Sequence, residues 1–183
     1  MHVVLKTDRL LLRQFTSADV DDLVELEGDP EVRRFTHGKP PSREAIERRR
    51  LPRILSMYQC LNGLGPVAVC ELSTGSFLGY IDLELPKEGR SPDSIEIGWR
   101  FRRSAWGHGY ATEAACKMIQ MIFDELPVQQ VFAQTMAVNR ASRRVMEKCG
   151  MRFVRALHKA WEDHVTGSEF GEVEYAIDRP REV

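Results

Sequence analysis

The chain has 183 residues, which suits a single domain with one sizeable core over residues 1–183. Its 26 basic and 27 acidic residues nearly balance, so no bulk charge draws it to nucleic acid or to a membrane surface. No stretch reaches membrane-spanning length, and the first residues lack the apolar core of a signal peptide. The four cysteines show no metal-ligand spacing. We therefore expect a cytoplasmic, enzyme-sized domain without a metal and without a nucleic-acid or membrane partner.

The first half of the chain is expected to form a strand, two helices and a hairpin. Residues 5–15 alternate as a strand, and Ser17 can cap a helix over residues 18–27 that turns Leu23 and Leu26 inward. A second helix starts at Ser42 and is expected to be interrupted near Pro52.

Three consecutive arginines, at positions 48–50, lie in that second helix. No aromatic or further basic stripe accompanies them, so we expect a solvated helix face rather than a nucleic-acid site. Residues 66–72 and 77–85 then predict two strands of a hairpin, joined by Ser-Thr-Gly-Ser.

The centre of the chain is the stretch Trp106-Gly-His-Gly-Tyr-Ala-Thr112. It follows a strand pattern over residues 94–101 and precedes a helical pattern over residues 111–126. A helix start offers free backbone N–H groups and a positive dipole end, which suits a phosphate. No Gly-Lys-Ser/Thr triplet of a Walker loop occurs, and Thr112 stands where a dinucleotide fingerprint needs its third glycine.

The last third predicts a buried strand over residues 131–138 and a helix that Asn139 opens and Gly150 closes. Cys116 and Cys149 fall on the two predicted helices, where we expect buried free thiols. Residues 155–161 and 172–177 predict a closing hairpin. The pattern is that of an α/β domain with a mixed sheet, antiparallel at first, and helices packed around it.

The succession of strand, Gly-x-Gly-x-Ala, helix, strand and Asn139-Arg-Ala-Ser142 with Glu147-Lys-Cys-Gly150 resembles the GNAT superfamily of N-acetyltransferases. The phrase Trp-Gly-His-Gly-Tyr-Ala-Thr-Glu-Ala is most similar to its RimJ/RimL-like branch of ribosomal-protein N-terminal acetyltransferases. The resemblance is specific over residues 94–153. It implies a mostly antiparallel mixed sheet, helices on both faces, and a splayed central strand pair that holds the acyl arm of acetyl-CoA.

The loop chemistry and the resemblance together nominate residues for binding acetyl-CoA. Backbone N–H groups of the loop would meet the pyrophosphate, a backbone N–H of the strand before it would meet the thioester carbonyl, and Asn139 would hold the pantetheine arm. Trp99 and Trp106 are expected to pack first of all. The nominated residues are Ile97, Gly98, Trp99, Arg102, Arg103, Gly107, His108, Gly109, Tyr110, Ala111, Thr112, Asn139, Ser142 and Arg144.

The chemistry needs a neutral amine and a stabilised thiolate. Glu96 is the expected base, because Ile95, Ile97 and Trp99 take the other face of its strand. His164, beside Glu162 and Asp163, is a second candidate. Many GNAT enzymes carry a tyrosine as proton donor to the thiolate, whereas this chain has Met146 there. The resemblance to the RimJ/RimL-like branch implies Ser142, one turn earlier, as the substitute.

These residues predict transfer of an acetyl group from acetyl-CoA to a primary amine by direct attack in a ternary complex. A protein or peptide N-terminus is favoured, because at pH 7 about one α-amine in ten is neutral against about one lysine in two thousand. Acids at Glu162, Asp163, Glu169 and Glu172 would attract a cationic amine.

Three alternatives stay open: a small-molecule amine acetyltransferase, a silent acyl-CoA-binding module without a thiolate donor, and a Rossmann-type nucleotide binder. The acceptor pocket is expected between residues 18–60 and 161–172, and the chain is either a monomer or a homodimer.

Overall fold

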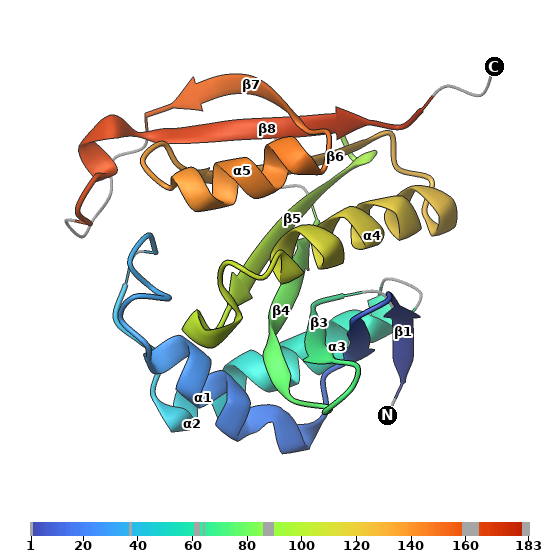
Figure 1. Ribbon diagram of the computed structural model, residues 1–183, viewed down its shortest axis with the longest axis vertical. Helices are drawn as coiled ribbons and strands as arrows, with labels where there is room; N and C mark the ends of the chain where they lie inside the picture. The colour runs from blue at the N-terminus through green and yellow to red at the C-terminus, as the bar shows by residue number, and fades with distance from the viewer. Residues whose placement is uncertain are drawn as a thin grey trace.

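A computed structural model describes residues 2–36, 38–60, 63, 65–85, 90–158 and 165–180. One eight-stranded sheet runs through the molecule in the order β1-β2-β3-β4-β5-β6-β8-β7, with β5–β6 as a parallel pair among antiparallel ones (Figure 1). The strands are β1 Val3–Lys6, β2 Leu10–Gln14, β3 Val67–Glu71, β4 Phe77–Glu84, β5 Ser94–Phe101, β6 Gln130–Met136, β7 Arg152–Leu157 and β8 Glu172–Asp178.

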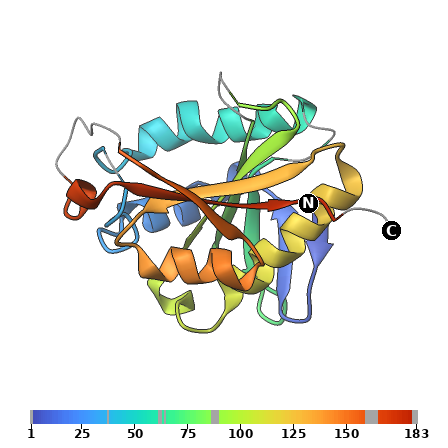
Figure 2. The same cartoon turned by 90° about the horizontal axis from the view of Figure 1, so that it is seen from above.

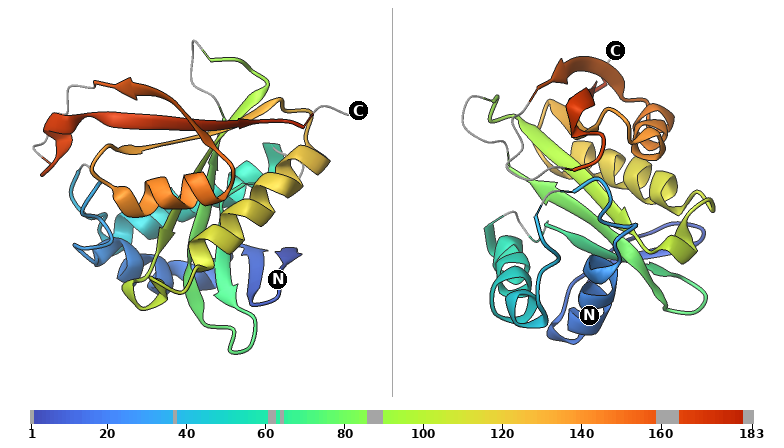
Figure 3. Two further views of the ribbon diagram at one scale, coloured as in Figure 1. Left: turned by 45° about the horizontal axis from the view of Figure 1, so that its top comes forward. Right: turned by 90° about the vertical axis from the view of Figure 1, so that its left-hand side faces the viewer.

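Helices cover both faces of this sheet (Figures 2 and 3). The helical elements, short 3₁₀ turns included, are η1 Ser17–Asp19, α1 Val20–Gly28, α2 Arg43–Ala45, the π turn η2 Ile46–Arg50, α3 Leu51–Cys60, η3 Arg103–Ala105, α4 Tyr110–Glu125, α5 Arg140–Lys148 and η4 Ser168–Phe170. The expected mixed α/β architecture is confirmed.

Each face of the sheet has its own apolar core. On the α4 side, Met118 and Ile122 of α4 and Met146 of α5 pack on strand residues such as Ile81 and Ile97. On the side of α1 to α3, Leu23, Leu26, Ile46 and Ile54 pack on Phe15, Ala68 and Phe77. Leu23 and Leu26 point inward, as their spacing predicts. The sheet is therefore buried on both sides, and its central strands carry apolar residues on both faces.

The central parallel pair separates soon after it starts. β5 and β6 are paired at Ser94, Ile95 and Glu96, and beyond Glu96 the β5 edge has no partner on β6. β6 turns instead to β8, with which it pairs along its whole length (Figure 1). The splay that the resemblance implies is confirmed. Beyond Glu96, β5 stays paired with β4, and its other edge has no strand partner.

Three expectations for the N-terminal half are wrong. Residues 5–15 form two strands rather than one, because Thr7 to Arg9 turn the chain into a hairpin. The first helix is capped by Thr16, whose hydroxyl accepts from the Ala18 N–H, and not by Ser17. The second helix is not interrupted at Pro52, because a π turn just before it leaves room for the proline ring in a continuous helix.

Other differences concern exposure and bounds. Arg50 does not lie on a solvated face, because it pairs with the buried Glu27. Trp106 is not a packing residue, because its side chain is 47% exposed. The closing hairpin begins earlier, at Arg152, and its second strand, β8, lies between β6 and β7. Cys116 and Cys149 are free but only half-buried, with their Sγ atoms 2.7 Å apart. Among the described residues, no helix is both long and apolar enough to cross a membrane.

Candidate acetyl-CoA and acceptor site

The loop between β5 and α4 presents bare backbone to solvent. Gly109 is the residue that caps α4, and its φ of 80° is one that side-chain-bearing residues rarely adopt. The first backbone bond of the helix runs from the Glu113 N–H to the Gly109 carbonyl (3.0 Å). Within the described part of the chain, the N–H groups of residues 109–112 donate to no acceptor. Four donors at a helix start are the arrangement that suits an anion, and they lie where the sequence leads us to expect the pyrophosphate.

A brace from the first hairpin holds this loop, and sequence reasoning missed it. Arg9 donates to the His108 carbonyl (3.0 Å) and pairs with Glu113 (2.6 Å), and its guanidinium lies 4.7 Å from the centre of the Tyr110 ring. Tyr110 in turn donates to Glu71 (3.1 Å). Burial works against it, but bonds from Thr7 and Arg9 hold the pKa of Glu113 below its ordinary value. A hundred residues separate the partners, so no local pattern signals the contact.

The arginines and the tryptophan beside the loop have different surroundings. The Arg102 guanidinium pairs with Asp22 and Glu25 (2.8 Å each) and donates to the Phe77 carbonyl, so it is held by α1 and β4. Arg103 is exposed and has no side-chain partner among the described residues. Trp106 donates its indole N–H to the Phe101 carbonyl (2.8 Å). Of the two nominated arginines before the loop, Arg103 is the one left available to an anion.

The start of α5 brings two further nominated residues together. The Asn139 side chain accepts from the Ser142 N–H (3.2 Å) and donates to Thr135 (3.0 Å), so it is a helix cap in this structure. The Ser142 side chain is half-buried, and its hydroxyl has no partner in the described residues. Met146, one turn on, is 1% exposed and belongs to the core.

Two arginines of α5 differ as Arg102 and Arg103 do: one has side-chain partners in the structure, and the other has none among the described residues. Arg143 donates to the Tyr175 hydroxyl (3.2 Å) and the Ala137 carbonyl (3.1 Å), which commits it to the fold. Arg144 is exposed and has no side-chain partner among the described residues. Arg144 therefore remains available to an anion, as nominated.

Next to the splay, β5 shows different residues on its two faces. Ile97 and Trp99 pack on the α4 side, so only their backbone can meet a ligand in the gap. Glu96 and Gly98 alternate with them and face α1 to α3. Glu96 is half-buried at the last paired position before β5 and β6 separate. The structure therefore places the expected base at the mouth of the splay.

A pocket of about 320 Å³ opens on the same face of the sheet as Glu96. We call it the acceptor pocket. Its apolar wall comes from the core of α1 to α3, and its polar lining from β4, β5 and the helices. The polar residues lining it are Arg33, Thr36, Arg50, Arg53, Tyr80, Asp82, Glu84 and Arg100.

Several of these polar groups are tied to one buried carboxylate. Glu27 is fully buried and pairs with Arg33 and Arg50 (2.9 Å each) and with Arg100, while the Tyr80 hydroxyl donates to it (2.9 Å). Burial would raise the pKa of Glu27, but Arg100 and Arg50 outweigh it and hold that pKa below its ordinary value. We call this group the Glu27 cluster. It forms one wall of the acceptor pocket, and no sequence motif predicts it.

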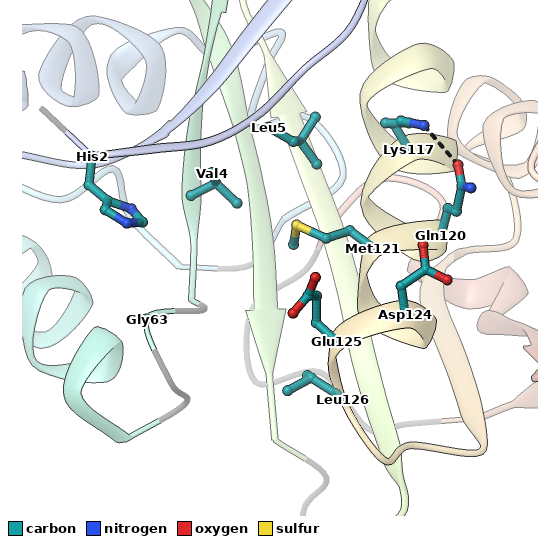
Figure 4. A pocket seen from close by; sticks show the side chains of 10 residues that line it. All are labelled: His2, Val4, Leu5, Gly63, Lys117, Gln120, Met121, Asp124, Glu125 and Leu126. Atoms are coloured by element: carbon teal, nitrogen blue, oxygen red, sulfur yellow. Dashed lines mark hydrogen bonds between the residues drawn. The ribbon is translucent and has the colours of Figure 1, made fainter.

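A second cavity, of about 400 Å³, lies between β1 and the far half of α4 (Figure 4). His2, Val4 and Leu5 line it from the first strand, opposite Lys117 and Met121 (Figure 4). None of the nominated residues lines it. The cavity is larger than the acceptor pocket but lies away from the loop and the splay.

The alternative base His164, with Glu162 and Asp163, falls outside the described residues. The other two acids of the expected acceptor pocket are not in it. The Glu169 carboxylate accepts from the Gly167 N–H (2.9 Å), and Glu172 is buried at the start of β8. The described acids at the pocket come from β4 instead.

Comparisons with known proteins agree with this geometry. The family model of the acetyltransferase (GNAT) domain matches residues 9–152. FsC-acetyl coenzyme A-N(2)-transacetylase of Aspergillus fumigatus is 34% identical over 96% of this chain and 76% of its own. A GNAT-family acetyltransferase from Bacillus anthracis superposes with a TM-score of 0.78 at 25% identity, covering 98% and 99% of the two chains.

The ribosomal L7/L12 α-N-protein acetyltransferase RimL, solved with coenzyme A, superposes with the same TM-score of 0.78. At 14% identity over 97% of this chain and 98% of its own, that likeness concerns the fold. The family match covers most of the chain, and the free loop donors and the splayed strand pair agree with it. This chain therefore belongs to the GNAT family of acetyltransferases and is an acetyl-CoA-dependent N-acetyltransferase.

Proposed function

We propose that the enzyme acetylates an α-amine, above all the N-terminus of a peptide or protein, as the RimJ/RimL-like resemblance implies. The observation that carries this proposal is the acceptor pocket, which places the carboxylates of Asp82 and Glu84 on the face of the sheet that also carries Glu96. Three of the four arginines that line the pocket are paired with Glu27, whereas these two carboxylates make no ion pair with a described residue and can meet a cationic amine. An α-amine is more acidic than a lysine amine, so it is the easier substrate to deprotonate.

The roles of the cofactor-binding residues follow from where the structure leaves donors without partners. The N–H groups of residues 109–112 bind the pyrophosphate of acetyl-CoA, and Arg103 and Arg144 add positive charge. The free edge of β5 from Ile97 to Trp99 holds the thioester end, and Asn139 the pantetheine arm. Arg102 has no part in this proposal, because two carboxylates already hold it.

Glu96 takes the proton of the incoming ammonium, directly or through a water, and Ser142 protonates the departing thiolate. We expect Glu96→Gln to lower kcat about a hundredfold or more at pH 7, and much of that loss to be recovered at pH 9, where the amine deprotonates unaided. The measurement is a pH–rate profile of both proteins. An equal loss at every pH would mean that Glu96 positions the substrate and does not act as a base.

The acceptor class is tested by the release of CoA thiol from acetyl-CoA. The acceptors are peptides with a free N-terminus, the same peptides with a blocked N-terminus and an internal lysine, and small amines. We expect turnover with the free N-termini and none with the blocked peptides. Turnover confined to small amines would instead favour the second candidate, a small-molecule acetyltransferase. The Aspergillus relative, whose name places the acetyl group at an N(2) nitrogen, favours that candidate.

A further inference from the structure

The acceptor pocket is lined by the carboxyl group of Asp82, whose neighbour across the sheet has no side chain. Asp82 lies in the middle of β4, directly opposite Gly98 of β5. A Cβ atom added to Gly98 would lie 3.7 Å from the Asp82 Cβ, so the two positions are neighbours on one face. Because Gly98 has no side chain, the β5 position directly opposite Asp82 places no side chain beside the carboxyl. That carboxyl therefore lines the pocket beside the strand edge where the thioester is expected.

Asp82 also makes no ion pair with any of the residues that the structure describes, although Arg50 and Arg100 lie near enough to affect its charge. Glu27, on the same face, is held by three arginines and a tyrosine, whereas the Asp82 carboxylate makes no ion pair or side-chain hydrogen bond with any described residue. Asp82 is half-buried, and a carboxylate partly withdrawn from water is stabilised by a cationic partner. A cationic amine entering the pocket would supply the missing partner.

We propose that Asp82 is a second catalytic carboxylate, which binds the acceptor ammonium and takes its first proton, so that Glu96 takes the proton that the nitrogen loses after its attack. This inference rests on the proposed function. One N–H bond of the ammonium breaks, and its proton moves to a carboxylate oxygen of Asp82. The freed lone pair forms the bond to the thioester carbon, and the carbon–sulfur pair leaves as thiolate. Glu96 takes the nitrogen's second excess proton, which finishes on that sulfur through Ser142. Asp82 afterwards releases its proton to water.

The surroundings of Asp82 suit this task. Burial and the neighbouring Glu84 raise the pKa of Asp82 to about 6, although Arg50 and Arg100 oppose the rise. Compared with an ordinary aspartate at 3.8, that change improves proton transfer from an amine about a hundredfold. The titratable and charged groups that face this part of the pocket are Glu27, Arg33, Arg50, Arg53, Tyr58, Tyr80, Glu84, Glu96 and Arg100.

The test is the pH dependence of kcat/KM with a free-N-terminus peptide as acceptor. In the wild-type enzyme we expect an acid limb with an apparent pKa of about 6. Asp82→Asn should lose that limb and about a hundredfold or more in kcat, while the KM for acetyl-CoA changes less than about twofold. An Asp82→Asn enzyme that keeps its kcat and its limb overturns the inference, as does a loss that is equal at all pH values.

Glu84→Gln is the matched second variant, and it serves even if Asp82→Asn does not fold. Removing one negative neighbour should move the acid limb to lower pH without abolishing turnover, because a like charge raises the pKa of a carboxyl. A limb that stays in place overturns the inference. A wild-type enzyme that acetylates none of the amines overturns the proposed function and this inference together. A wild-type enzyme that is active with an unaffected Asp82→Asn variant overturns the inference alone.

Discussion

The loop that starts α4 and the Glu27 cluster are both dense in hydrogen-bonding groups. They differ in whether those groups have partners inside the protein. In the Glu27 cluster one buried carboxylate forms ion pairs with Arg33, Arg50 and Arg100 and accepts a hydrogen bond from Tyr80. Its negative charge is therefore neutralised inside the protein. In the loop, the N–H groups of residues 109–112 meet no described acceptor. Buried polar groups that are satisfied hold a fold together, whereas donors left open at the surface are available to a ligand. The difference separates residues that shape this site from residues that act in it.

The largest expected effect concerns the Glu27 cluster, whose polar groups are paired, and it is an effect on stability. Glu27→Gln should lower the free energy of unfolding by about 3 to 5 kcal/mol, because it leaves three guanidinium groups without their shared anion. Urea unfolding at pH 7 measures it. Glu25→Gln is the control: that side chain is 70% exposed in its pair with Arg102, and its loss should cost less than about 1 kcal/mol. Equal costs would remove the distinction between the cluster and a surface pair.

The same cluster predicts a dependence on pH. The pKa of Glu27 is lower in the folded protein than in the unfolded chain, so its contribution is present above the unfolded value of about 4.5 and is lost as the pH falls through the folded value. The difference in unfolding free energy between wild type and Glu27→Gln should therefore shrink below about pH 4.5. A difference that stays constant down to pH 3 would contradict this.

On the open side, Gly109→Val should weaken acetyl-CoA binding at least about a hundredfold while the protein stays folded. A β-branched side chain at the helix cap would stand where the pyrophosphate meets the N–H groups. Isothermal titration with acetyl-CoA measures the change. Gly75→Val is the matched control, because Gly75 has a similar φ of 74° with open space around it in the β3–β4 turn. Equal losses in both variants would point to backbone strain instead.

The smallest effect is expected at α5. There Ser142, whose hydroxyl has no described partner, lies one turn from Met146, which is buried in the core. Ser142→Ala should lower kcat about ten- to hundredfold with little change in acetyl-CoA affinity, because a thiolate with a pKa near 8.5 needs only part of the help of a general acid. Met146→Leu should leave kcat unchanged and cost less than about 1.5 kcal/mol of stability, as a volume-conserving core swap. Full kcat in Ser142→Ala would reduce the hydroxyl to a cofactor contact.

The sequence by itself determined the parts of the site that one stretch of chain can build. The strand over residues 94–101 has the predicted bounds, Gly109 lies at the start of the α4 helix, and Asn139 caps α5 by accepting from the Ser142 N–H. Each of these features depends on residues within four positions of one another, where hydrogen-bond geometry and steric limits act directly. The resemblance to GNAT enzymes rests on the same short segments, which is why the family could be predicted.

The tertiary structure alone decided which charges meet. Arg9 reaches Glu113, Glu27 gathers arginines from three segments, and Asp82 lies bare because its neighbour across the sheet is Gly98. In the sequence these charged residues have no neighbouring partner, so they are expected to lie in solvent. For Arg50 that expectation is wrong. Strand register and the packing of α1 bring together residues as far apart as Arg9 and Glu113 (104 positions) or Glu27 and Arg100 (73 positions), and neither follows from local propensity. The acceptor pocket is built from such contacts, so its chemistry emerged only with the fold.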